Sequence, residues 1–135
     1  MRIQNLIIEK MIDHVLKEDP LEGCGILAGS DEIVSHLYRI TNTARSPNRY
    51  LMDPQQQLHA MMDADRNGWD ILAFYHSHTH GPAYPSQTDV RMALQSGWLT
   101  VRYVLISLLD KVSPQTKVFH IEENGNISEE ELLVT

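Results

Sequence analysis

The chain has 135 residues, of which 42% are hydrophobic, and its formal net charge is −7. A chain of this length can bury an ordinary core without disulfide or metal cross-links, so we expect a single domain over residues 1–135. The sequence has no basic run, which argues against a nucleic-acid surface and against attraction to anionic lipid. A basic or neutral protein partner remains compatible with the negative charge.

Cysteine usage and hydropathy indicate the compartment. Cys24 is the only cysteine, so an intramolecular disulfide is impossible. The N-terminal stretch "MRIQNLIIEKMIDHVLKEDP" is amphipathic and lacks the continuous apolar core of a signal peptide. No later stretch is long enough to span a bilayer, and we therefore expect a cytoplasmic protein.

The first forty residues predict a helix followed by two strands. Apolar residues recur at helical spacing from Ile3 through Leu6 to Leu16, and the helix is expected to end near Pro20. "GCGILAGS" and "EIVSHLYRI" have the composition of strands that pair with each other. The next stretch, "TNTARSPNRYLM", is predicted to be a loop from its Asn, Ser and Pro content.

A second helix is predicted to begin at Asp53, with Pro54 in its first turn and Gln56 placed for a capping box. The helix is expected to end at Asn67-Gly68. The side chains expected to face the core are Leu58, Met61 and Met62.

The second half predicts a strand over "WDILAFYHSH", then a helix from a cap at Ser86 to a stop at Gly97. "VRYVLISLL" and "TKVFHIEE" are expected to form strands separated by a turn, and a last strand is expected near "SEEELLV". This order of elements predicts a mixed α/β fold with hairpins and not a repeating βαβ unit.

The stretch "FYHSHTHGPAYPSQTD" concentrates residues that bind metals. On a strand, His76 and His78 project to the same face and can supply two ligands of a tetrahedral zinc site. Asp89, in the first turn of the next helix, can supply a third. Two histidines and one carboxylate leave one position open, as in catalytic zinc sites. Such a site also needs a base, for which Glu22 is a candidate, and an oxyanion donor, for which Ser86 is a candidate.

Each of these residues also has a purely structural interpretation. Ser86 and Asp89 are spaced like a capping box, which explains both without a metal. His76 and His78 could be a core histidine and an exposed one, and Glu22 could be an ordinary surface carboxylate. The spacing of Ser86 and Asp89 from the two histidines favours the metal site, whereas spacing alone does not single out Glu22.

The pattern H-x-H-x7-S-x-x-D, formed by His76, His78, Ser86 and Asp89, resembles the JAMM motif of MPN/Mov34-type (JAB) zinc metallopeptidases. "PLEGCGILAG" around Glu22 resembles the segment of that family that carries an upstream glutamate. "TNTARSPNRYLMDP", "AFYHSHTHGPAYPSQTD" and "VRYVLISL" are similar to the short prokaryotic members, so the resemblance extends over nearly the whole chain.

The resemblance implies the JAB/MPN fold, a curved, mainly antiparallel sheet flanked by helices and related to cytidine deaminases. It implies one zinc ion per chain, bound by His76, His78 and Asp89, with Glu22 activating water and Ser86 supporting the oxyanion. Some short members cut amino acids or peptides from the C-terminal Gly-Gly of ubiquitin-like sulfur-carrier proteins, so the implied partner is such a carrier.

The sequence departs from many family members directly after the second motif histidine, where Thr79 stands in place of a proline and is followed by His80. His80 could compete for the metal or contact substrate, although Gly81-Pro82 discourages continuation of the strand. We also expect the "SPNRY" loop to border the cleft and Arg49 to meet the substrate's tail.

Three functions compete at this point. The first is a zinc metallopeptidase that cleaves a peptide or isopeptide bond after a Gly-Gly terminus. The second is a catalytically silent MPN module that scaffolds a complex, which is disfavoured because no motif ligand is missing. The third is a peptidase that uses Cys24 as its nucleophile. A small buried residue between two glycines is the favoured interpretation of that cysteine.

Overall fold

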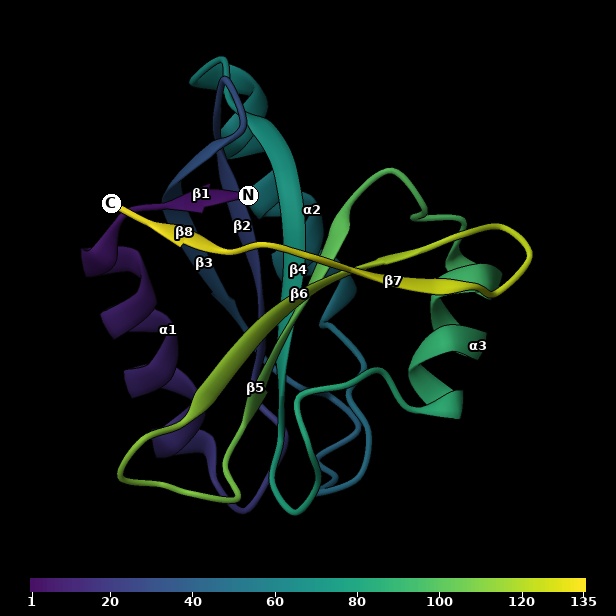
Figure 1. The fold of residues 1–135 in the computed structure, drawn as a ribbon. Helices are drawn as coiled ribbons and strands as arrows, with labels where there is room; N and C mark the ends of the chain where they lie inside the picture. The colour runs from purple at the N-terminus through teal and green to yellow at the C-terminus, as the bar shows by residue number, and fades with distance from the viewer.

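The computed structural model describes residues 1–135 as one eight-stranded, curved sheet flanked by three helices (Figure 1). The helices are α1 (Asn5–Glu18), α2 (Pro54–Arg66) and α3 (Gln87–Ser96). The strands are β1 (Arg2–Ile3), β2 (Cys24–Ser30), β3 (Ile33–Ile40), β4 (Asp70–His78), β5 (Arg102–Ser107), β6 (Gln115–Ile121), β7 (Ile127–Glu130) and β8 (Leu133–Val134). None of the helices is long and apolar enough to cross a membrane.

The strands follow the order β7-β6-β5-β4-β2-β3-β1-β8 across the sheet. The predicted hairpin of β2 with β3 and the predicted pair of β5 with β6 are both antiparallel, which confirms these two predictions. β4 lies near the middle, antiparallel to β2 and parallel to β5. A parallel pair needs a crossover connection, and α3 lies in the one that joins β4 to β5. The mixed α/β class and the mainly antiparallel sheet expected from the sequence are therefore confirmed.

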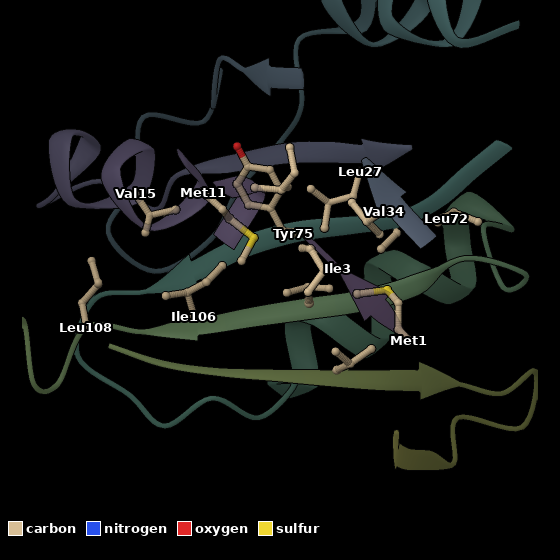
Figure 2. Packing of buried hydrophobic residues seen from close by; sticks show 14 residues of the cluster. Met1, Ile3, Met11, Val15, Leu27, Val34, Leu72, Tyr75, Ile106 and Leu108 are labelled. Carbon is tan, nitrogen blue, oxygen red and sulfur yellow. The ribbon is translucent and has the colours of Figure 1, made fainter. Parts of the chain in front are cut away.

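Side chains of β4 alternate between two apolar layers, as the period of a strand requires. Tyr75 belongs to the layer that α1 covers, and Phe74 belongs to the layer that α2 and α3 cover. Figure 2 shows Met11 and Val15 of α1 in the first layer together with Tyr75. Because His76 and His78 have the same parity as Phe74, the fold directs both toward the α2 and α3 side.

The predicted first helix is wrong at its start. Ile3 lies in β1, where it is fully buried between β3 and β8, and α1 begins only at Asn5. Leu6, counted as part of the apolar face, is 56% exposed. The apolar spacing is nevertheless real from Ile7 onward, because Ile7, Met11 and Val15 are buried. A two-residue strand is too short to show a period of two, which explains the error.

The predicted caps of the other two helices are confirmed, with one difference. Asp53 accepts hydrogen bonds from the backbone N–H groups of residues 55 and 56, and α2 ends at Asn67. Gln56, however, does not complete a capping box. Its amide instead bonds Thr41 in the preceding loop, accepting from the backbone N–H at 2.7 Å and donating to the hydroxyl.

The predicted core face of α2 is wrong. Leu58 is 55% exposed and Met62 is 52% exposed, and only Met61 is half-buried. The buried residues are Ala60 and Ala64, which lie on the opposite side of the helix. Small side chains such as those of Ala60 and Ala64 let the helix pack closely on the sheet. The larger apolar residues were therefore a misleading guide to the buried face.

The last strand is also divided differently from the prediction. The stretch expected to form one strand over residues 128–134 contributes to two. β7 pairs antiparallel with β6 at one edge of the sheet, and β8 pairs with β1 at the other edge. Figure 1 shows β8 beside β1, close to both ends of the chain.

Candidate metal centre

The C-terminal end of β4 brings the two motif histidines together. His76 and His78 are alternate residues of the strand, so their rings emerge on the same face. His76 is fully buried and His78 is half-buried. The imidazoles contact each other edge to face, with their centroids 5.0 Å apart. The Nε2 atoms of the two rings lie 3.2 Å apart.

Asp89 reaches the strand end from the first turn of α3. Ser86 is the N-cap of that helix, and its hydroxyl accepts the backbone N–H of Asp89 at 3.0 Å. The Asp89 carboxylate accepts the backbone N–H of Ser86 at 2.9 Å through Oδ2, which completes a capping box. The capping box expected for these two residues is therefore confirmed, and the same carboxylate oxygen also faces the histidines.

Three ligand atoms converge on one point. Asp89 Oδ2 lies 2.9 Å from His78 Nε2 and 3.1 Å from His76 Nε2. Ligands about 2.0–2.1 Å from a tetrahedral zinc ion are separated from one another by about 3.3 Å. The observed spacings of 2.9–3.2 Å come close to one face of such a tetrahedron. His76, His78 and Asp89 therefore lie close enough to bind a metal ion.

Charge interactions within this group are strong. Burial opposes ionisation of the Asp89 carboxyl, but attraction to His76 and hydrogen bonds from both histidines and Ser86 hold its pKa well below the usual range. Burial also opposes protonation of His78, yet its hydrogen bonds to Asp89 and to the Pro82 carbonyl raise its pKa. The site thus holds an ionised carboxylate ready to accept positive charge.

Glu22 reaches the same place through the register of the sheet. β2 is antiparallel to β4, with Cys24 opposite His76. Glu22 lies two residues before Cys24 and His78 lies two residues after His76, so the same register places Glu22 beside His78. Glu22 is 3% exposed, and its Oε1 atom is buried without a hydrogen-bond partner. Burial raises the pKa of Glu22 to about 8, with the charge of His78 lowering it and that of Asp89 raising it.

A polar cleft of about 250 Å³ opens over these groups. None of its lining residues is hydrophobic, and they are Glu22, Pro47, Asn48, His78, Thr79, His80, Gly81 and Ser86. The cleft therefore brings the candidate base and the candidate oxyanion donor to the side of His78.

Thr79, which stands where many family members have proline, and the following His80 lie in different environments. Thr79 is buried, and its hydroxyl donates to the Pro47 carbonyl at 3.0 Å, which joins the two walls of the cleft. His80 is exposed on the cleft wall and is not part of the group that converges with Asp89. β4 ends at His78, as the Gly81-Pro82 pair suggested.

The "SPNRY" loop borders the cleft as predicted, because Pro47 and Asn48 line it. The Arg49 side chain is exposed, and contact with a substrate tail stays a prediction.

Sequence reasoning missed two residues of this loop region. Tyr50 stacks on His76, with ring centroids 4.3 Å apart and an interplanar angle of 29°. Asn42 is buried, and its amide donates to the carbonyls of Glu22 and Arg49 at 3.0 Å each. Its carbonyl oxygen accepts two backbone N–H groups, from residues 44 and 51. A tyrosine and an asparagine in a loop carry no periodic signal, and only their place in "TNTARSPNRY" could have pointed to them.

The remaining candidates lie away from the centre. Cys24 is fully buried, and burial raises the pKa of its thiol to about 12. Both properties are unfavourable for a nucleophile. His14 lies on the buried face of α1 in a 2.6 Å hydrogen bond with the Tyr75 hydroxyl, and burial lowers its pKa to about 4. The His36 ring lies against the Trp69 ring, with their centroids 3.8 Å apart.

Comparison with known proteins decides the family. Residues 5–120 match the family described as prokaryotic homologues of the JAB domain. The chain belongs to this family. The resemblance stated from the motif is thereby confirmed, and so is the JAB/MPN fold.

Relatives of this prokaryotic JAB protein are described as peptidases. The CysO-cysteine peptidase of Mycobacterium tuberculosis is 37% identical over 130 residues, which cover 92% of this chain and 84% of that protein. A probable TtuB-protein conjugate cleaving protease of Thermus thermophilus is 41% identical over 88 residues, covering 64% and 59%. A solution structure from Desulfitobacterium hafniense superposes with a TM-score of 0.88 at 34% identity, covering 99% and 92%. The names of the first two relatives support hydrolase activity for this chain.

Proposed function

We propose that this JAB protein is a zinc-dependent metallopeptidase that cleaves the peptide or isopeptide bond following the C-terminal Gly-Gly of a ubiquitin-like sulfur-carrier protein. The observation that carries the proposal is the convergence of His76, His78 and Asp89 beside the buried carboxyl of Glu22. Two nitrogen ligands and one oxygen ligand fit zinc in a site with an open position. The two relatives' names, a cysteine conjugate of CysO and a protein conjugate of TtuB, support a small carrier protein as the substrate class.

Bound zinc would supply a Lewis acid that polarises the scissile carbonyl and acidifies water. Glu22 then accepts a proton from the attacking water, whose oxygen forms the new bond to the carbonyl carbon. The same carboxyl returns that proton to the leaving amine as the carbon–nitrogen bond breaks. A pKa raised to about 8 in the metal-free site suits this double role, because a nearby cation lowers it toward neutrality.

Ser86 is proposed to stabilise the oxygen that becomes negative during attack. Its hydroxyl oxygen already accepts the Asp89 N–H, so the hydroxyl proton is free to point into the cleft. A preorganised donor of this kind costs little reorganisation when charge develops.

The decisive experiment combines metal analysis with cleavage of defined conjugates. Purified wild type, Glu22→Gln and His78→Ala are analysed for zinc and incubated with a Gly-Gly carrier extended by one cysteine or joined to a lysine side chain. Mass spectrometry then identifies the bond that is cut. We expect about one zinc ion per chain in wild type and Glu22→Gln, cleavage after Gly-Gly only in wild type, and loss of both in His78→Ala.

Turnover by Glu22→Gln is expected to fall at least ~100-fold, the range for a general base. Full activity of that variant would remove Glu22 from the mechanism. A wild type that binds zinc and cuts neither conjugate would favour the alternative, a catalytically silent scaffold module. That alternative is weaker because the ligand set is complete.

Arg49 provides a test of how the carrier's tail is recognised. Its side chain is exposed next to Asn48 of the cleft wall and remains free for an incoming carboxyl or carbonyl group. Arg49→Ala is expected to raise KM for the carrier conjugate with zinc content unchanged. An unchanged KM would show that the guanidinium does not contact the tail.

A further inference from the structure

The two histidines of the centre are held in different ways. His78 donates its Nδ1 proton to the Pro82 carbonyl at 2.8 Å, which directs Nε2 toward Asp89. His76 has no such bond, because its Nδ1 atom is buried without a partner. Histidines that bind metals almost always donate the second ring N–H to an oxygen, and this bond fixes the tautomer and the plane of the ring. Something else must therefore orient the His76 ring.

The Tyr50 ring occupies the position that such an orienting group needs. It lies nearly parallel to the His76 imidazole, at a centroid distance of 4.3 Å. Tyr50 also lines an apolar pocket with Met52 and Phe74, so its ring is wedged between the imidazole and the α2 and α3 layer. A flat ring in this place restricts rotation of the His76 imidazole about its side-chain bonds.

A ring on a loop can position another group only if the loop itself is fixed. Asn42 fixes it, because all four hydrogen-bonding positions of its amide are used. Two of the four bonds join the residues on either side of Tyr50, Arg49 and Leu51. Another joins the carbonyl of Glu22. The same amide thus connects the backbone of the candidate base to the backbone that carries Tyr50.

The bonding pattern continues along the loop. The backbone N–H of Glu22 donates to the Ser46 carbonyl at 2.9 Å, and Thr79 donates to the Pro47 carbonyl. Four anchor points, at Ser46, Pro47, Arg49 and Leu51, therefore hold the loop segment that carries Tyr50. A loop with this many hydrogen bonds keeps the Tyr50 ring in a fixed position relative to the end of β4.

We propose that Tyr50 is the positioning residue for His76, replacing by ring stacking the hydrogen bond that His76 Nδ1 lacks, and that Asn42 holds Tyr50 in place. This inference rests on the zinc-binding part of the proposed function and not on the identity of the substrate. Its consequence is that the loop and the metal ligand are coupled. Loss of the Tyr50 ring weakens zinc binding even though Tyr50 contributes no ligand atom.

The test measures zinc affinity directly, by competition of the metal-free protein with a chromophoric chelator. The variants are Tyr50→Phe, which keeps the ring, and Tyr50→Leu, which keeps apolar bulk without it. Tyr84→Leu is the matched control, because Tyr84 is a half-exposed ring that packs on Phe119 and not on His76. We expect Tyr50→Phe and the control to remain within about twofold of wild type and Tyr50→Leu to bind ~10- to 100-fold more weakly.

A second pair of variants tests the anchor. Asn42→Asp removes the two donated hydrogen bonds and keeps the shape, whereas Thr43→Ala removes one bond of the same loop, to the Leu51 carbonyl, and leaves Glu22 untouched. We expect weaker zinc binding in Asn42→Asp only. Imidazole nitrogen NMR of the metal-free variants provides a readout that simple destabilisation does not move. The His76 signals are expected to be sharp in Tyr50→Phe and broadened in Tyr50→Leu.

The outcomes separate this inference from the proposed function. If wild type binds zinc but cuts no conjugate, the peptidase proposal fails and the role of Tyr50 stands or falls on the affinities alone. If Tyr50→Leu binds zinc as tightly as wild type and keeps sharp His76 signals, the positioning role is refuted. If Tyr50→Leu does not fold, the Asn42→Asp and Thr43→Ala pair decides in the same way. A wild type that binds no zinc overturns both proposals.

Discussion

Glu22 allows a prediction about stability that is independent of activity. Its carboxyl is buried beside the candidate metal centre with Oε1 unpartnered, and burial raises its pKa from 4.5 to about 8 in the metal-free chain. In the unfolded chain the carboxyl loses its proton at the lower pH. Between the two values only the folded state keeps that proton, so rising pH favours unfolding. This is the reverse of the usual behaviour of a paired carboxylate.

The size of the effect follows from the difference in pKa. A change from 4.5 to about 8 corresponds to about 5 kcal/mol when complete, at ~1.4 kcal/mol for each tenfold change in proton affinity. Glu22→Gln removes the ionisation and keeps the shape. The metal-free variant is therefore expected to match the metal-free wild type near pH 4. Its free energy of unfolding is then expected to exceed that of wild type by a further ~1.4 kcal/mol per pH unit until about pH 8.

Urea unfolding of the chelator-treated proteins, followed by tryptophan fluorescence from about pH 4 to about pH 9, measures this difference. Glu9→Gln, which removes one carboxyl from the exposed side of α1, controls for the change in net charge. A stability difference between Glu22→Gln and wild type that does not vary with pH would refute the reasoning. It would mean that the Glu22 carboxyl loses its proton as easily in the folded protein as it does in water.

Three further predictions concern other parts of the molecule. Cys24 is fully buried, and burial raises the pKa of its thiol to about 12. Iodoacetamide is therefore expected to leave the thiol unmodified and the activity unchanged, whereas a chelator is expected to abolish activity. Inactivation by the alkylator alone would instead support a cysteine nucleophile. Gly25→Ala places a Cβ 2.3 Å from the buried ring of Tyr75 and is expected to lower the free energy of unfolding by ~3 kcal/mol, measured by urea titration. Gly81→Ala meets no atom closer than 4.0 Å and serves as its control, and equal stabilities would contradict the packing argument. His80→Ala is expected to raise KM about 2- to 10-fold, as for one lost hydrogen bond, with zinc affinity unchanged; weaker zinc binding would instead make His80 part of the metal site.

The local features of the centre could be predicted from the sequence because each depends on neighbouring residues. Alternation along a strand placed His76 and His78 on one face, and the cap spacing placed Asp89 in the first turn of a helix. The position of Glu22 could not be obtained in this way. It depends on the register that sets Cys24 opposite His76, which sequence spacing does not encode. The family resemblance was the only signal for it.

Errors in the fold arose where the hydrophobic pattern was a poor guide to burial. On α2, the large residues Leu58 and Met62 are exposed while Ala60 faces the sheet, since the helix lies close to the strands beneath it. Asn42 was missed for a related reason. Its four hydrogen bonds connect segments up to twenty residues apart. No local sequence pattern predicts a side chain that bonds several backbone segments at once.

The reciprocal bonds between Ser86 and Asp89 belong to the start of α3 and need no cation to form. In zinc fingers the ion holds the chain together, and extraction unravels it. Here the capping box orients the aspartate without any metal, so we expect the metal-free protein to stay folded. If the proposed zinc site is present, cobalt would occupy the same position, and its visible absorption would report coordination number and geometry in solution.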